Sequence, residues 1–400
     1  MVVPEDWESR PIGDFLEFKN GLNKGKEYFG HGTPIVNYMD VYHHRGLHRK
    51  EIQGRVSLDA NEIRRFGVKK NDVFFTRTSE TPDEVGISSV LLDELPDGVF
   101  SGFVLRGRPK SDELLPNYCK YCFSTEEVRE EIIRTCTYTT RALTNGNVLS
   151  RIHVLVPSED EQQRIAEALN DVDNLIESME KLIAKKRDLR ERLAQELLTG
   201  ARRLPGFDGP WRQVNLQDAL ELCTETIPVS DIDETTYVGT ENMLKDKGGV
   251  ASFDKHVTYA NVREYLPGDI LFSNIRPYLK KIWFADRSGG CSNDVLVLRS
   301  VDANLYDSHY CYLVLSRDDF FAFVTNNSSG TKMPRGDKEA VKTYQIAMPE
   351  GIGEQRAVSQ VLTDVDDDII ETERKLSKYK QVRQGMMREL LTGRIRLAQE

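Results

Sequence analysis

The segment EQQRIAEALNDVDNLI at residues 161–176 recurs in the same chain as EQRAVSQVLTDVDDDI at residues 354–369. The match continues without a gap to an ELLTG block in each copy, and an Arg-Leu pair follows each block at 203–204 and 396–397. A match at a constant offset over this length indicates an internal duplication, the feature to look for first in a long chain. We therefore expect the molecule to be built twice on one plan.

Weaker matches extend the duplication over the rest of each half. Trp7 corresponds to Trp211, and NDVFFTR at 71–77 corresponds to GDILFSN at 268–274. A variable segment thus alternates with a well-matched one. The predicted parts are a first globular domain at 1–156, a helical spacer at 157–205, a second globular domain at 206–348 and a second helical spacer at 349–400.

The matched segments predict long helices. In the first, apolar residues recur at alternating steps of four and three from Ile165 to Ile183, and in the second from Val358 to Leu376. This is a heptad-like seam of the kind that packs one helix against another. Acidic residues come early and basic residues late, which suits each helix dipole and favours an antiparallel pair. The seam is predicted to continue through Leu182, Leu189, Leu193 and Leu197 in the first helix and through Val382, Met386 and Leu390 in the second.

The variable segments predict a mixture of strands and helices. Each contains short strand-like runs bounded by turn residues, together with one helical stretch, at 117–133 or at 308–323. Such a mixture indicates a compact α+β domain. The expected fold class is therefore α+β, with two mixed α/β globular domains joined by two long antiparallel coiled-coil helices in a pseudo-two-fold internal repeat. The predicted strands lie at 36–41, 73–76, 87–92, 270–272, 282–285 and 295–298.

Composition places the chain among soluble globular proteins of the cytoplasm. Hydrophobic residues make up 39% and charged residues 30% of the sequence, which suits neither a disordered chain nor a membrane-spanning one. The opening MVVPEDWESR has no basic patch before an apolar stretch, so a signal peptide is not expected. Six cysteines in 400 residues are too sparse for a disulfide framework. We expect reduced thiols and no membrane contact.

The net charge of −10 limits the ways in which the chain could bind nucleic acid. Basic and acidic residues are equal in number over 8–155, and acidic residues are in excess over 207–348. A protein that coats DNA without sequence preference usually carries a large basic excess. Any DNA binding must therefore come from local basic loops.

In the order of its segments, the chain resembles the specificity subunit of a type I restriction-modification system. The resemblance covers essentially the whole length. The two helix openings quoted above, each after a Val-Pro or Met-Pro strand end, and the two ELLTG blocks match spacer segments of that family. NDVFFTRTSETPDEVG at 71–86 and GDILFSNIRPYLKK at 268–281 match its recurrent strand-and-loop segments. Their order, repeated once, makes the resemblance specific.

The resemblance implies a DNA-recognition subunit that performs no catalysis. Each globular domain would read one half of a split, asymmetric target in double-stranded DNA. The helix pair would set the gap between the halves and dock two modification subunits, which carry S-adenosylmethionine and methylate adenine. Restriction-translocation subunits, which use ATP and magnesium, would join afterwards. No cofactor is expected on this chain, and its dissimilar variable segments imply two different half-targets.

For DNA contact we consider loop residues that can hold phosphates or read base edges. Arg and Lys contact phosphate or guanine, whereas Asn and Gln pair with adenine. The strand ends at Thr76 and Ser273 are equivalent in the repeat, so Arg77 and Arg276 are the leading pair. The predicted DNA-binding residues are Lys24, Lys26, Arg77, Thr78, Ser79, Arg141 and Asn145 in the first domain, and Asn274, Arg276, Tyr278, Lys280, Lys332 and Arg335 in the second.

For any one of these residues a solvated surface charge is the simpler interpretation. As sets on two equivalent loops, they favour DNA binding. Arg141 and Lys332 in particular carry a base at matched positions before the last strand of each domain.

Motifs for catalysis or metal binding are weak. An adenine methyltransferase needs an Asn/Asp-Pro-Pro-aromatic loop to hold a flipped base, and the nearest match, at 274–278, lacks the paired prolines. The sequence has no GxxxxGK[ST] loop for ATP. Cys119 and Cys122 have the spacing of a zinc or redox pair, but no second pair accompanies them. His43, His44 and His48 could form a metal cluster, but histidines beside Arg45 and Arg49 more often lie on a solvated or phosphate-facing loop, so we predict no metal site.

Two other functions stay open. A structural adaptor would dimerise its partners through the helices and bind proteins through the globular domains, which suits the acidic total better than the basic loops. An enzyme with a degenerate motif would transfer methyl groups by itself.

Overall fold

The computed structural model describes residues 4–138, 140–253 and 260–397. Contacts within the chain divide it into two units that each combine distant parts of the sequence. Unit 1 consists of residues 1–180 and 374–400, and unit 2 of residues 181–373. This division groups the predicted segments but does not test their boundaries, which stay predictions.

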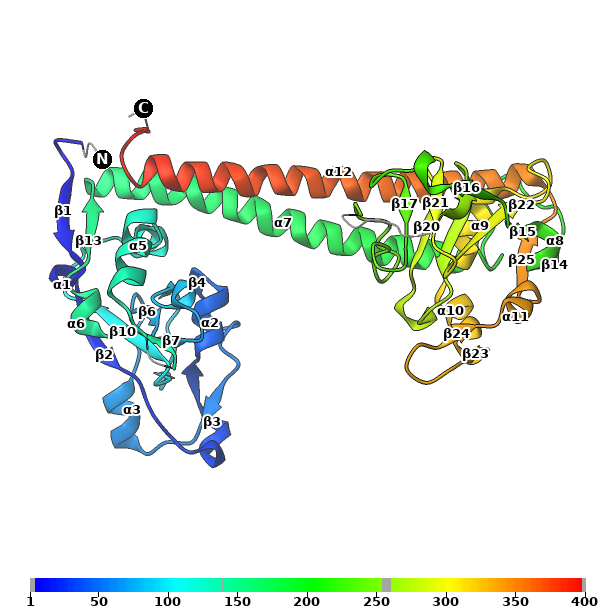
Figure 1. Ribbon diagram of the computed structural model, residues 1–400. Helices are drawn as coiled ribbons and strands as arrows, with labels where there is room; N and C mark the ends of the chain where they lie inside the picture. Colours follow the sequence, from blue (N-terminus) through cyan, green and yellow to red (C-terminus); the bar gives the residue numbers. More distant parts are fainter. Residues whose placement is uncertain (1–3, 139, 254–259, 398–400) are drawn as a thin grey trace. The chain divides into compact units, whose positions relative to one another are not determined.

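Two long helices contribute to both units. They are α7 (Glu159–Leu197) and α12 (Ile352–Leu390), and the unit boundary falls inside each of them. Each unit therefore holds one mixed globular domain and a part of each helix (Figure 1). The predicted α+β class with two long helices is confirmed.

The globular domain of unit 1 is built on a five-stranded sheet in the order β2-β10-β6-β8-β4. Neighbouring strands are antiparallel, apart from the edge strand β4, which runs parallel to β8. The core combines side chains from this sheet with others from α4, α5 and α7. The strands are β1 (Glu8–Pro11), β2 (Leu16–Asn20), β3 (Phe29–Val36), β4 (Gly46–Leu47), β5 (Arg55–Val56), β6 (Val73–Thr76), β7 (Thr78–Ser79), β8 (Ser88–Leu91), β9 (Val99–Phe100), β10 (Val104–Pro109), β11 (Thr137–Tyr138), β12 (Ala142–Leu143) and β13 (His153–Val156). The helices are α1 (Ile12–Phe15), η1 (Lys26–Tyr28), α2 (Tyr38–His43), α3 (Ala60–Phe66), η2 (Pro82–Glu84), α4 (Pro116–Cys122), α5 (Glu126–Thr135) and α6 (Gly146–Leu149).

The domain of unit 2 is built on a four-stranded antiparallel sheet in the order β15-β22-β19-β20. A second four-stranded sheet has the order β16-β18-β21-β17. The strands are β14 (Trp211–Asn215), β15 (Leu220–Leu222), β16 (Thr226–Pro228), β17 (Tyr237–Val238), β18 (Asn261–Tyr265), β19 (Ile270–Ser273), β20 (Ile282–Phe284), β21 (Gly289–Cys291), β22 (Val295–Ser300), β23 (Ser328–Ser329), β24 (Arg335–Gly336) and β25 (Gln345–Pro349). The helices are α8 (Leu216–Ala219), η3 (Val229–Asp231), η4 (Pro277–Leu279), α9 (Ser308–Leu315), α10 (Asp318–Asn326) and α11 (Lys338–Lys342).

Each of the two domains contains an ion pair with a buried carboxylate between two strands of its central sheet, and the two pairs are equivalent. Asp72, just before β6, accepts two hydrogen bonds from Arg108 of β10 at 2.8 and 2.7 Å. Asp269, just before β19, accepts two from Arg299 of β22 at the same distances. Both carboxylates are buried. The weak match between residues 71–77 and 268–274 thus reflects one structural device used twice.

Five of the six predicted strands are confirmed, as β6, β8, β19, β20 and β22. The strand predicted at 36–41 is wrong, because β3 ends at Val36 and the helix α2 begins at Tyr38. Asn37 and Asp40 form a capping box, in which each side chain bonds the backbone N–H of the other. This cap outweighs the β-propensity of Val41.

Each predicted helix of the variable segments is in fact two helices. The stretch at 117–133 divides into α4 and α5, since Thr125 leaves the helical conformation and its hydroxyl accepts from Val128 N to cap α5. The stretch at 308–323 divides into α9 and α10 in the same way, with extended backbone at Arg317.

Within each unit the two long helices run side by side and antiparallel (Figure 1). Later residues of α7 pair with earlier residues of α12, and acidic positions meet basic ones as predicted. The ion pairs are Asp173–Arg383 at 3.0 Å and Glu180–Lys380 at 2.6 Å in unit 1, and Lys186–Asp368 at 2.7 Å and Arg190–Asp366 at 2.9 Å in unit 2.

The predicted seam of α7 is partly wrong. Ile176, Met179 and Ile183 are buried as expected. Leu182 and Leu189, however, are 44% and 46% exposed. A contact with one neighbouring helix buries only a narrow stripe, and residues beside that stripe stay in solvent. Val382 of α12 is exposed for the same reason.

The C-terminal end of α12 contributes to the core of the first domain, and the C-terminal end of α7 contributes to the core of the second domain. Leu390 and Leu391 of the C-terminal segment lie in the core that contains Trp7. Leu197 and Leu198 lie in the core that contains Ile270. The ELLTG block at 196–200, at the end of α7, therefore packs in the domain of unit 2. The block at 389–393, at the end of α12, packs in the domain of unit 1.

Ion pairs fasten these crossed ends. Arg396 bonds the buried Glu161 at the start of α7, which also accepts from Trp7 Nε1 at 2.9 Å. Arg203 bonds the buried Glu354 at the start of α12, with one contact of 2.6 Å. The repeated Glu and Arg of the sequence are thus partners in space.

The half-buried His309 is expected to make the stability of unit 2 depend on pH. His309 stacks on Tyr312 at 5.8 Å between ring centroids and meets the edge of Phe284 at 4.9 Å. Burial lowers the pKa of His309 below its ordinary value of 6.5. Below about pH 6.5 His309 is protonated in the unfolded chain but stays neutral in the folded unit. The free energy of unfolding therefore falls as the pH decreases toward the folded pKa.

We therefore expect the urea midpoint of unit 2 to fall more between pH 7.5 and 5.5 in the native chain than in His309→Gln. His43→Gln, at an exposed position, serves as the control and should keep the native pH dependence. An identical pH dependence in His309→Gln and the native chain would contradict the assignment.

Candidate nucleic-acid interface

The candidate site begins where the central strand of each domain ends. After β6, Arg77 N donates to Phe103 O at 2.9 Å, and Arg77 O accepts from Thr144 N at 3.0 Å. After β19, Asn274 N donates to Asp294 O at 2.8 Å, and Asn274 O accepts from Gly336 N at 3.0 Å. Arg77 and Asn274 therefore occupy the same backbone position in the two domains.

This equivalence is the one that the match of residues 71–77 with 268–274 indicates. The strand ends at Thr76 and Ser273 do match, but the counterpart of Arg77 is Asn274 and not Arg276. Arg276 lies two residues further, in the left-handed region at φ 50°, and its N–H donates to Pro334 O at 2.8 Å. Arg77 and Arg276 thus lie on the two matched loops at different positions, and their role as DNA contacts stays a prediction.

The second predicted pair, Arg141 and Lys332, lies on the adjoining loops. The equivalent hydrogen bonds of Thr144 and Gly336 align the loops that precede them. Counted back without a gap, Arg141 then stands opposite Met333, one residue beyond the predicted partner Lys332. Arg141, Lys332 and Met333 are all exposed.

Within each domain the two predicted loops lie together. In the first, β7 pairs with β12, which places Thr78 and Ser79 beside the strand that follows Arg141. In the second, Ile275 forms a β-bridge with Arg335. The structure thus gathers the following predicted residues: Arg77, Thr78, Ser79 and Arg141 in unit 1, and Asn274, Arg276, Tyr278, Lys332 and Arg335 in unit 2.

The remaining predicted residues have local structural roles or lie elsewhere. Lys24 pairs with Glu62 at 2.8 Å, a bond that raises the pKa of Lys24, and lies over the ring of Tyr28. Lys26 is exposed at the start of η1. The other two are Asn145, which caps α6 through Val148 N at 3.1 Å, and Lys280, which pairs with Asp318 at 2.8 Å.

Arg335 and Arg77 differ in how readily their guanidinium groups can turn to a ligand. Arg335 pairs with Asp294 at 3.0 Å, but its side chain is 60% exposed. Such exposed pairs contribute about 0–1 kcal/mol, so a phosphate can replace the carboxylate at little cost. Arg77 donates from Nη1 to Gly102 O at 3.2 Å, and its Nε meets no acceptor in the described part of the chain.

In unit 1 a pocket of about 410 Å³ opens between the gathered loops. Its lining includes Thr78, Ser79 and Arg141, all predicted, and also Tyr38, Glu84 and Phe103, which were not. Phe103 is 54% exposed. The sequence offered little sign of these three residues, because α2, η2 and the turn before β10 meet only in the folded domain.

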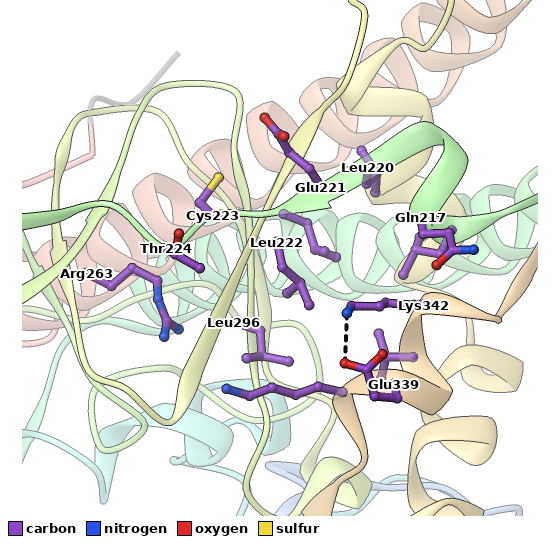
Figure 2. A pocket seen from close by; sticks show the side chains of 14 residues that line it. Gln217, Leu220, Glu221, Leu222, Cys223, Thr224, Arg263, Leu296, Glu339 and Lys342 are labelled. Atoms are coloured by element: carbon purple, nitrogen blue, oxygen red, sulfur yellow. Dashed lines mark hydrogen bonds and ion pairs between the residues drawn. The ribbon is translucent and has the colours of Figure 1, made fainter.

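A different hollow, of about 450 Å³, lies between β15 and α11 in unit 2 (Figure 2). Leu220, Leu222 and Leu296 make its walls apolar, and an ion pair between Glu339 and Lys342 at 2.7 Å lies at one side. Cys223 also lines it, and burial raises the pKa of its thiol to about 11. The thiol is therefore protonated near neutral pH and is a poor nucleophile.

The cysteine pair and the histidines have ordinary surroundings. Cys119 and Cys122 are buried in α4, and burial raises the pKa of the Cys122 thiol. His48 pairs with Asp93 at 3.1 Å, and His44 contacts a backbone oxygen of α2. Across residues 4–138, 140–253 and 260–397, no group of three His, Cys, Asp or Glu side chains is placed to hold a metal ion.

In the part of the chain that the structure describes, no helix has both the length and the apolar character needed to cross a membrane.

The amino-acid sequence is similar to those of known specificity subunits. Residues 4–185 match the family described as the type I restriction modification DNA specificity domain. The chain is 22% identical to the type I restriction enzyme MjaVIII specificity subunit of Methanocaldococcus jannaschii, over 99% of this chain and 95% of that protein. It is 21% identical to the type I restriction enzyme EcoDI specificity subunit of Escherichia coli, over 62% and 63%.

Solved structures with the same fold span nearly the whole chain. The type I restriction-modification S subunit from M. genitalium gives a TM-score of 0.60 at 15% identity, covering 98% of this chain and 97% of that one. The HsdS subunit from Thermoanaerobacter tengcongensis gives 0.54 at 15% identity, covering 99% of both. At such identity the likeness shows the arrangement of two domains and two long helices.

Proposed function

Because the chain belongs to the specificity subunits of type I restriction-modification systems, we propose that each of its two domains reads one half of a split DNA target. The observation that carries this division is the equivalence of Arg77 and Asn274. One backbone position, held by the same two hydrogen bonds in each domain, presents different side chains. A repeated scaffold whose matched loops carry different side chains suits the reading of two different half-targets.

The contact chemistry differs between the domains. Unit 1 offers Arg141, which lines the pocket, and Arg77, which directly precedes the lining residue Thr78. Unit 2 offers the exposed Arg276 and Tyr278, with Lys332 and Arg335 on the adjoining loop, whereas the Asn274 side chain is only 7% exposed. Arginine forks can bind guanine edges or phosphates, and aromatic or apolar side chains can contact a thymine methyl group. The two sets therefore favour different base pairs.

The partner subunits proposed for the chain would supply DNA affinity, the cofactors and the catalytic activities. Its acidic total leaves little general attraction for phosphate, so assembly with two modification subunits would make DNA binding strong. Those subunits would carry S-adenosylmethionine, and restriction subunits would bring ATP and magnesium. We assign this chain recognition without catalysis or a cofactor of its own, a cytoplasmic location, and helices that set the gap between the half-targets.

A competition assay tests the proposal. Labelled target DNA is bound by the chain assembled with its modification subunits, and unlabelled duplexes altered in one half at a time compete for it. Alteration of either half should weaken competition, and the lone chain should bind less tightly than the assembly. Equal competition by unrelated DNA would contradict the proposal and favour a structural adaptor.

A further inference from the structure

The pocket of unit 1 contains a carboxylate that the DNA-recognition proposal has not used. Glu84, the last residue of η2, accepts from Tyr38 Oη through Oε2 and from Tyr42 Oη through Oε1, each at 3.4 Å. Ser79 Oγ also donates to Oε2. Three hydroxyl groups from β7 and α2 therefore hold the carboxylate in one orientation inside the pocket.

The charge of Glu84 is left without a cation. In the described stretches of the chain, no lysine or arginine side chain forms an ion pair with it. A carboxylate has about four acceptor positions and no donor, and three of them are used here. One position on Oε1 remains, so the group can accept one more hydrogen bond from a ligand.

The surroundings restrict which ligand this is. Arg141 and the exposed Phe103 line the same pocket, so its mouth is suited to a polar, partly aromatic partner. Phosphate is excluded as a partner of Glu84, because both groups are negatively charged. Base edges do carry the required donor, an exocyclic amino group of cytosine or adenine in the major groove.

We propose, on the premise that unit 1 reads a half-target, that Glu84 is a specificity-determining residue that accepts a hydrogen bond from the amino group of one base. Cytosine N4 is the usual partner of a carboxylate, and adenine N6 is the other source of the same donor. Glu84 repels phosphate, so it contributes discrimination more than affinity.

The second domain provides an internal contrast. Its short helix η4 begins at Pro277 as η2 begins at Pro82, and each helix has three residues. Leu279 therefore stands where Glu84 stands. We therefore expect a carboxylate to read one base pair in the half-target of unit 1. The equivalent position in unit 2 has no carboxylate and should read none in this way.

The test measures competition by duplexes in which each base pair of the target is replaced in turn, using the chain assembled with its modification subunits. Glu84→Ala should reduce discrimination at a single base pair of one half-target by about 5- to 150-fold. Glu84→Gln, whose amide prefers adenine, should convert a preference for cytosine at that position into one for adenine. Glu94→Ala, exposed on unit 1 and outside the pocket lining, should leave every position unchanged.

The outcomes distinguish a failure of the proposed function from a failure of the role assigned to Glu84. If the native assembly does not distinguish its target from scrambled DNA, the proposed function itself fails. If it does, and Glu84→Ala and Glu84→Gln both keep the native preference at every base pair, the assignment of Glu84 is overturned. Equal weakening at all positions by both variants also overturns it, because that is the signature of a purely structural residue.

Discussion

Leu390→Ala, at the C-terminal end of α12, is expected to destabilise unit 1 by about 2–5 kcal/mol while leaving unit 2 unchanged. Leu390 is buried in the core that contains Trp7 and Leu169, although more than 200 residues of sequence separate it from them. Removal of a buried leucine loses its transfer free energy and leaves a cavity. The damage should therefore appear far from the substitution in sequence.

The repeat supplies the reciprocal variant. Leu197→Ala, at the matching position of α7, should destabilise unit 2 and leave unit 1 unchanged, because Leu197 lies in the core with Ile270. Hydrogen exchange measured separately over 73–109 and 270–300 reports the two units. Leu182→Ala, at an exposed position on α7, is the control and should alter neither. Loss of protection in the same unit from both core variants would contradict the crossed arrangement.

Arg77→Ala is expected to reduce discrimination in one half-target by about 5- to 150-fold and to leave the other half intact. Arg77 is half-buried, its Nε is buried without a partner in the described chain, and Nη1 has one contact to a backbone oxygen. A bidentate contact from arginine to guanine is worth about 1–3 kcal/mol of discrimination, whereas a phosphate contact weakens all sequences nearly equally. Competition by targets altered in one half measures the difference.

Matched variants make this result specific. Arg276→Ala should affect only the other half-target, since Arg276 is exposed on the loop of unit 2. Lys70→Ala, exposed on unit 1 but outside the gathered loops, should change neither half. The assignment would be wrong if Arg77→Ala and Arg276→Ala impaired the same half, or if neither impaired any.

Much of the fold could be predicted because the chain carries the same plan twice. A gapless match reveals the long helices, and the change from acidic to basic residues along them indicates their antiparallel contacts. The buried central strands were found for a similar reason, since β6 and β19 share an apolar pattern bounded by turn residues. The family resemblance added what the residues alone could not say, namely a split DNA target.

The site was predicted less completely, because loops are positioned by tertiary contacts. The sequence match aligns Asn274 with Arg77, but the hydrogen bonds that hold both loops join residues about 20 to 70 positions apart, and the sequence does not show those partners. Glu84 enters the pocket through hydroxyl groups of β7 and α2. Leu182 is exposed because the contact between the helices is narrower than the apolar pattern of α7 suggests.

Recognition of a split target by the two domains is tested most directly by mapping DNA methylation in cells that express this chain with its modification subunits. The account predicts one methylated motif made of two different specified halves, separated by a gap of fixed length and free sequence. Arg77→Ala should relax or abolish the specification of one half only. A single continuous motif, or two halves altered together by Arg77→Ala, would contradict the account.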